Sequence, residues 1–240
     1  MPFGLLKSAT GQLDKVDIAL ATMGGVVEQQ LSDSISAFER ADIVLATDVR
    51  DRDVTVDQHE RAIERQVVDI LEEKRPTGEA LRRALTAVKI AAEMERIGDL
   101  SKNVAKRTLA LSTLEERDSP VDVGPVVARM GRRALTQFGE GLDSLFQGNA
   151  DAARAVRDAD DQIDELYNSI FREILVGMSQ YAGGVLAGTH LVFIAKNFER
   201  IGDHATNIAE RVHFSLTGNQ LEAERPKRDV TMNVEALPAR

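Results

Sequence analysis

The chain has 240 residues, 39 of them acidic and 30 basic, which gives a formal net charge of −9. The length fits one large domain or two small ones, and a hydrophobic content of 43% excludes global disorder. The acidic balance argues against a protein that wraps nucleic acid or lies on an anionic membrane by charge. Cysteine is absent, which excludes disulfides and thiolate sites and fits a reducing cytoplasm.

Long proline-free stretches rich in Ala, Leu, Glu and Arg predict helices. Six are expected in chain order, near residues 10–46, 50–74, 79–114, 122–148, 150–179 and 185–216. The polar residues from 217 to 240 are expected to form a disordered tail. The most apolar stretch, residues 183–195, is far shorter than the ~20 residues of a membrane-spanning helix, and the first residues lack the pattern of a signal peptide. We therefore expect a soluble, cytoplasmic protein.

An internal repeat organises the chain. A shift of 107 residues places Met23–Gly24 on Met130–Gly131 and Val49–Asp51 on Val156–Asp158. After Pro76 the shift becomes 104, so that the segment Glu-Arg-Ile-Gly-Asp at 95–99 falls on the same five residues at 199–203. The predicted fold class is therefore all-α, with two tandem, sequence-related three-helix bundles. The expected boundaries are 1–117 for the first repeat, 118–216 for the second and 217–240 for the tail.

Pairs of carboxylates four residues apart recur at matching positions of the two repeats. Residues i and i+4 of a helix share one face, and hard cations take carboxylate oxygens as ligands. Two pairs from neighbouring helices could therefore anchor a cluster of metal ions. The candidate ligands are Asp53, Asp57, Glu95 and Asp99 in the first repeat and Asp160, Asp164, Glu199 and Asp203 in the second.

A solvated helix face is the competing interpretation of these pairs. Chance alone supplies roughly six acid pairs at this spacing in a chain so rich in acids, so one pair is weak evidence. Recurrence in both repeats favours a shared task. On a helix, Ile97 and Val104 lie nearly opposite Asp99, which predicts a site on the bundle surface and not in its core.

Other recurring residues accompany the carboxylates. Asn103 and Asn207 lie one turn further along, either as outer-shell donors or as plain surface amides. The helical glycines favour close helix packing over room for a ligand; they are Gly24, Gly98, Gly131 and Gly202. His204 has Leu100 as its counterpart, which favours a structural role. A ferritin-like di-iron site is weakly supported, because only Glu210-x-x-His213 has the required spacing.

The segments 92–103 (AEMERIGDLSKN) and 195–211 (AKNFERIGDHATNIAER) resemble the PhoU family, as does Met23–Glu28. The likeness covers about residues 12–216. It implies two three-helix bundles whose acidic motifs, the eight carboxylates above, bind multinuclear metal clusters on the surface. It also implies a bacterial accessory regulator of phosphate uptake that conveys the state of the transporter to a sensor histidine kinase.

The resulting expectation is a non-enzymatic regulator with no catalytic residues. Its expected partners are the ATPase of a phosphate ABC transporter and a sensor histidine kinase, and its metal is Fe, Mn, Mg, Ca or Zn. We also expect a homodimer, no nucleic acid, and membrane contact only through partners. A carboxylate-bridged metalloenzyme and a metal-free helical adaptor remain the alternatives. Residues 42–73 carry a net charge of −6 and residues 149–179 one of −4, so the acidity lies on the second helix of each repeat.

Overall fold

The computed structural model describes residues 3–114, 122–159, 161–180 and 184–221, and every regular element within them is a helix. The all-α prediction is thus confirmed. The helices are α1 (Phe3–Arg40), α2 (Ile43–Arg52), α3 (Val54–Lys74), α4 (Gly78–Leu111), α5 (Gly124–Phe146), α6 (Ala150–Asp158), α7 (Asp161–Gln180) and α8 (Val185–Thr217). Of the predicted tail, only residues 217–221 are described, and the candidate ligand Asp160 lies outside the described residues.

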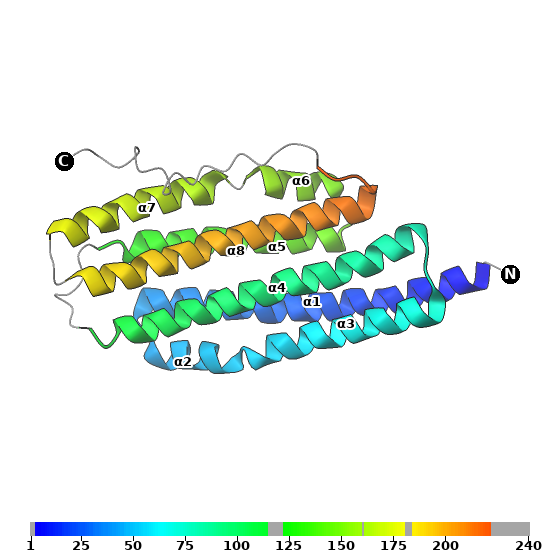
Figure 1. The fold of residues 1–240 in the computed structure, drawn as a ribbon, viewed down its shortest axis with the longest axis horizontal. Coiled ribbons are helices and arrows are strands. Elements are labelled where there is room, and N and C mark those ends of the chain that lie inside the picture. The colour runs from blue at the N-terminus through cyan, green and yellow to red at the C-terminus, as the bar shows by residue number, and fades with distance from the viewer. Residues whose placement is uncertain (1–2, 115–121, 160, 181–183, 222–240) are drawn as a thin grey trace.

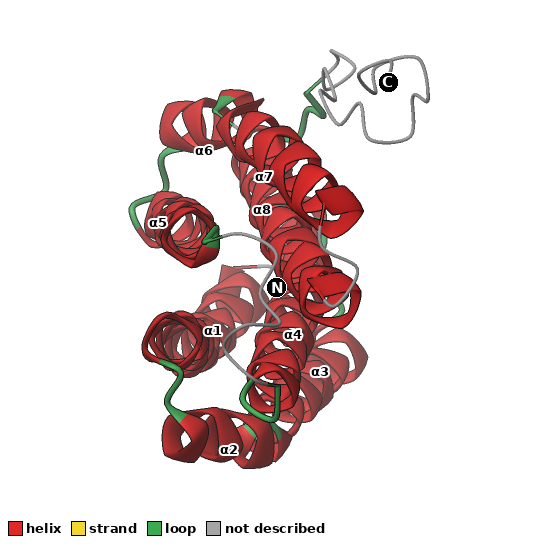
Figure 2. Cartoon of the chain, turned by 90° about the vertical axis from the view of Figure 1, so that its left-hand side faces the viewer, coloured by secondary structure: helices red, strands yellow, loops and turns green. Residues whose placement is uncertain are grey.

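The first four helices form one bundle and the last four form the other (Figure 1). Seen end-on, α4 and α8 lie side by side in the middle, α1 and α5 lie beside them on one side, and α2–α3 and α6–α7 lie at opposite ends (Figure 2). The helices α4 and α8 run antiparallel, because Glu93 contacts His204 whereas Arg107 contacts the earlier residue His190. No helix in the described part of the chain is long and apolar enough to cross a membrane.

The second helix of each bundle is interrupted, so the described residues form eight helical segments where six helices were expected. In the first repeat α2 ends at Arg52 and α3 begins at Val54, with Asp53 at the break. In the second repeat α6 ends at Asp158 and α7 begins at Asp161. The two breaks occupy matching positions in the repeat, next to the first candidate ligand of each.

The turn between the first and second helices is also shared by the repeats. Ala41 and its counterpart Gly148 both have positive φ values, 50° and 62°. The next residue caps the following helix: Asp42 Oδ1 accepts a hydrogen bond from the backbone of Leu45 at 2.9 Å, and Asn149 Oδ1 accepts one from Ala152 at 3.0 Å. The first helix therefore ends at Arg40 and not near 46 as predicted.

A continuous apolar core joins the two bundles. Buried side chains from both repeats, including Met94 and Phe198 on the two central helices, belong to one cluster. Glycines allow the closest approaches: a Cβ at Gly24 would lie 2.7 Å from Leu142 Cδ1, and one at Gly131 would lie 2.8 Å from Phe198 Cζ. These glycines therefore serve close packing between α1, α5 and α8.

Candidate metal-binding faces

The acidic face of the first repeat lies where the α2–α3 break meets α4. Asp53 is 6% exposed and accepts a hydrogen bond from Gln30 Nε2 on its Oδ1 at 2.9 Å. Its other oxygen, Oδ2, is bonded by Lys102 Nζ, which also donates to Asp99 Oδ1 at 2.7 Å. The ammonium group of Lys102 thus lies between two of the four predicted ligands.

The remaining acids of this face repel one another. Burial, and then the charge of Asp99, raise the pKa of Glu95 to about 7. Burial also raises the pKa of Glu60, with the charges of Glu64 and Asp57 adding to it. Burial works against ionisation of Asp99 too, but the hydrogen bond and charge of Lys102 outweigh it and lower the pKa of Asp99. This face therefore combines crowded acids with one internal cation.

The acidic face of the second repeat lies between α7 and α8. Asp164 is 5% exposed and Glu199 is 6% exposed, while Asp203 is half-buried. Glu199 Oε1 accepts a hydrogen bond from Lys196 Nζ at 2.9 Å, but Glu199 Oε2 is buried without a hydrogen-bond partner. Burial raises the pKa of Glu199 despite Lys196, and the charges of Asp203 and Asp164 act in the same direction.

The two faces differ at one central position. The counterpart of Lys102 in the second repeat is Thr206, which is fully buried. Its hydroxyl accepts a hydrogen bond from Gln137 Nε2 at 2.8 Å, where Gln137 is the counterpart of Gln30. The second face therefore has a neutral hydroxyl where the first has an ammonium group.

The carboxylates lie deeper than the predicted surface site. Among the seven described candidate ligands, Asp53, Asp164 and Glu199 are buried. The helical glycines explain the difference, because a Cβ at Gly98 would lie 3.2 Å from Val56 Cγ1 and one at Gly202 would lie 2.8 Å from Ile163 Cδ1. Such close contact of the second and third helices encloses the acids that flank the glycines.

The donor chemistry of both faces suits hard cations, which prefer carboxylate oxygens. Within the described residues, no three His, Asp or Glu side chains converge closely enough to hold a metal ion. The second face nevertheless offers a cation Glu199 Oε2, a buried carboxyl oxygen without a hydrogen-bond partner. The first face fits poorly, because Lys102 already bridges Asp53 and Asp99.

The two accompanying asparagines have different surroundings. Asn103 is exposed on α4. Asn207 Nδ2 donates to Glu93 Oε2 at 3.2 Å, and His204 Nδ1 lies 2.7 Å from the same oxygen. Asn207 and His204 therefore join α8 to α4, which agrees with the structural role expected for His204.

Sequence reasoning missed Glu60 and Lys102. Both lie one turn beyond a predicted ligand, Glu60 after Asp57 and Lys102 after Asp99. Recurrence between the repeats could not select them, because their counterparts are Tyr167 and Thr206. Their helical spacing was the available signal, since residues three apart are neighbours on a helix.

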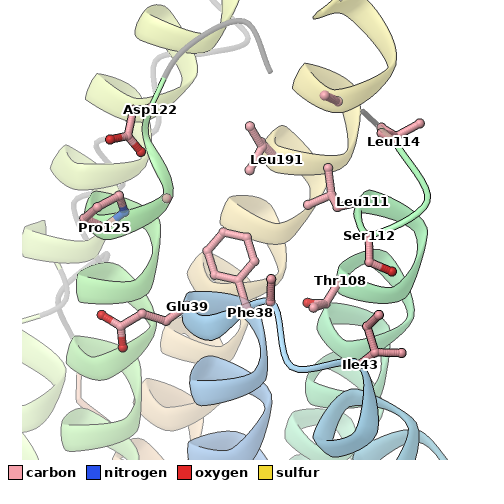
Figure 3. A pocket seen from close by; sticks show the side chains of 13 residues that line it. Phe38, Glu39, Ile43, Thr108, Leu111, Ser112, Leu114, Asp122, Pro125 and Leu191 are labelled. Carbon is pink, nitrogen blue, oxygen red and sulfur yellow. The ribbon is translucent and has the colours of Figure 1, made fainter. Parts of the chain in front are cut away.

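A separate cavity of about 610 Å³ lies at the end of the molecule where α1 and α4 end and α5 and α8 begin (Figure 3). Apolar side chains such as Phe38, Leu111 and Leu191 line it, together with Glu39 and Asp122. Glu39 is also paired with Arg132 Nη1 at 2.8 Å. The cavity contains none of the candidate ligands.

The chain forms two tandem three-helix bundles that pack through their third helices, and each bundle bears an acidic face. These features define the class of protein as a duplicated all-helical protein. A family model described as the PhoU domain matches residues 20–108 and 127–212, once in each bundle. The chain therefore belongs to the PhoU family.

Known proteins resemble the chain over nearly its whole length. It is 40% identical over 225 residues to a phosphate-specific transport system accessory protein PhoU homolog of Caulobacter vibrioides, covering 94% of this chain and 96% of the relative. A homolog of the same name from Rhizobium meliloti is 38% identical and covers 91% of both chains. The crystal structure of PhoU from Pseudomonas aeruginosa matches with a TM-score of 0.83 at 32% identity, covering 88% of this chain and 99% of that one.

Proposed function

We propose that this protein regulates phosphate uptake and phosphate-starvation signalling as a non-enzymatic accessory protein. It would act through contacts with the ATPase of a phosphate transporter and with a sensor histidine kinase. The observation that carries the proposal is the match of both repeats to one family, whose relatives of similar length are named as accessory proteins of a phosphate-specific transport system. That name supports association with the transporter.

The first turns of α8 offer a surface for protein contact. Val185, Leu186 and Phe193 are 46%, 56% and 46% exposed, and they fall within one sector of the helix. The guanidinium of Arg107 lies 4.0 Å from the centroid of the Phe193 ring, which adds a cation to this apolar surface. Exposed apolar side chains that gather on one face are typical of binding surfaces.

Metal bound by the carboxylate faces is the second part of the proposal. A divalent cation would neutralise the acids and cross-link neighbouring helices. Support comes from the recurrence of the acid pairs and from the partnerless oxygen of Glu199. Elemental analysis of protein purified without chelator tests this part: bound Fe, Mn, Mg, Ca or Zn is expected, and metal-free protein that takes up none on addition would refute it.

Binding experiments with the purified transporter ATPase and the cytoplasmic part of the kinase test the partners. We expect both to bind the wild-type chain and Phe193→Ser to weaken at least one complex about tenfold or more, the loss typical of a central interface aromatic. Val68→Ser is the matched control, because Val68 on α3 is similarly exposed, at 50% against 46% for Phe193. Binding to neither partner would contradict the proposal.

A further inference from the structure

We propose that a pocket on the seam between α4 and α8 binds a phosphate ester. The pocket has a volume of about 380 Å³ and lies between the first turns of α4 and the last turns of α8, at the right-hand end of these helices in Figure 1. None of the described candidate metal ligands lines it, and the exposed apolar surface at Phe193 belongs to the other end of α8. The proposal is therefore independent of metal binding and of the protein contacts proposed above.

Three cationic side chains line this pocket. Arg82 and Lys89 come from α4, and Arg211 comes from α8. Within the described residues none of the three forms an ion pair, and the buried Nε atoms of the two arginines have no hydrogen-bond partner. Buried N–H donors without acceptors are costly, and an oxyanion would relieve that cost. Both helices therefore offer donors to one anionic group.

Two carboxylates lie near these cations, but both also have other partners. Glu210 lines the pocket, and its Oε1 lies 3.4 Å from Arg157 Nε. The charge of Arg211 acts on Glu93, whose Oε2 is already contacted by two other side chains of α8. Three cations against one lining carboxylate leave the pocket with a net positive charge, in a chain whose formal net charge is −9.

The internal repeat shows that the cations gather at only one end of the seam. Under the shift of 104 residues Arg211 corresponds to Arg107, and Lys89 corresponds to Phe193. At the matching end of the seam, the guanidinium of Arg107 lies 4.0 Å from the centroid of the Phe193 ring. Lys89 thus replaces the aromatic partner of a cation–π contact with a second positive charge. Like charges in one pocket repel each other, and an anion between them would reverse that repulsion.

The charge and the walls of the pocket together indicate a phosphate ester. Three cations suit a phosphate dianion better than a single carboxylate, and a guanidinium group binds two phosphate oxygens at once. The volume falls within the range of small-molecule sites and leaves room for a substituent on the phosphate. Much of the remaining wall is apolar and would contact that substituent; it consists of Leu81, Leu85, Phe214 and Leu221.

A purely structural role is the competing interpretation for Arg82. A Cβ at Gly218, the residue that ends α8, would lie 3.5 Å from Arg82 Cζ, so the guanidinium lies beside the C-terminus of this helix. A cation at that position favours the helix dipole. This role involves neither Lys89 nor Arg211, so variants of those two residues separate the interpretations.

Isothermal titration calorimetry of the full chain with phenyl phosphate tests the proposal. Inorganic phosphate lacks the ring and benzoate lacks the phosphate, so both are comparison ligands at the same ionic strength. We expect one saturable site for phenyl phosphate and at least tenfold weaker binding of either comparison ligand. Arg211→Gln should weaken the binding of phenyl phosphate at least tenfold and Lys89→Gln at least threefold. Arg65→Gln, at an exposed arginine of α3 outside the pocket, is the matched control and should leave the affinity unchanged.

Lys89 is exposed, so Lys89→Gln keeps the proposal testable even where Arg211→Gln disturbs folding, which circular dichroism detects. Absence of phenyl phosphate binding to the wild type would overturn the proposal. Binding that neither Arg211→Gln nor Lys89→Gln weakens would overturn it as well. Inorganic phosphate that binds as tightly as phenyl phosphate would overturn the assignment to an ester, and benzoate that does so would overturn the assignment to phosphate.

Discussion

Glu93 shows how a single carboxylate joins the two repeats. Its Oε2 lies 2.7 Å from His204 Nδ1 and 3.2 Å from Asn207 Nδ2, both across the seam between α4 and α8. Burial opposes ionisation of Glu93, but the hydrogen bonds from His204 and Asn207 and the charge of Arg211 outweigh it, so the pKa of Glu93 falls below its ordinary 4.5. The charged form of Glu93 is therefore the one that stabilises the fold.

We expect Glu93→Gln to lower the free energy of unfolding by about 1 kcal/mol at pH 7, allowing for solvent access to the pair. A lowered pKa means that this stabilisation is present above pH 4.5 and is lost as the pH falls through the pKa of the folded state. The difference between variant and wild type should therefore shrink below pH 4.5. Urea unfolding at pH 7, 5.5 and 4 measures it, with the exposed Glu140→Gln as control; an equal loss at all three values would contradict the assignment.

Recurrence between the repeats selected the candidate acids, but it could not select the lysine that accompanies them in the first repeat. The charge of Asp99 helps to raise the pKa of Glu95, and the charge of Asp57 helps to raise the pKa of Glu60. Lys102 could not be selected, because a residue present in only one repeat carries no recurrence signal. The burial of Asp53 was also unpredictable, since it depends on how closely two helices approach.

At the scale of helices, turn residues decided which boundaries could be predicted. Gly148 and Asn149 are a typical helix end and helix start, and the predicted helices ended at 148 and began at 150 as observed within two residues. Their counterparts Ala41 and Asp42 adopt the same turn, but alanine at positive φ gives no signal. The breaks at Asp53 and near residue 159 escaped prediction because the apolar periodicity continues through them.

Close helix contact at Gly131 makes a prediction at this scale. A Cβ there would lie 2.8 Å from Phe198 Cζ and 2.9 Å from Ile35 Cγ1, both buried side chains. Gly131→Ala should therefore lower the free energy of unfolding by about 1–3 kcal/mol, the usual cost of overpacking. Gly139→Ala on the same helix is the control: its nearest atom lies 3.8 Å away, so it should gain up to about 1 kcal/mol of helix propensity. Equal stability of the two variants in urea would contradict the packing role.

At the scale of the whole molecule, the continuous core makes the two bundles one folding unit. The pairs α4–α8 and α1–α5 pack across the repeat boundary, and buried residues of both repeats form one cluster. We expect a single cooperative transition in calorimetry of the metal-free chain, and we expect Gly131→Ala to shift the whole transition. Two resolved transitions, only one of which moves, would show that the bundles unfold separately.

The duplicated fold thus carries two acidic faces. Lys102 bonds two carboxylates of the first face, whereas Glu199 Oε2 of the second face is a buried carboxylate oxygen without a hydrogen-bond partner, for which we propose a metal ion. An anomalous-difference map of crystals of the wild-type chain grown with Mn²⁺ tests this most directly. We predict a peak about 2.1–2.5 Å from Glu199 Oε2, the range of hard-cation–oxygen bonds, and none between Asp53 and Asp99. A peak of equal height beside Lys102, or no peak at either face, would contradict it.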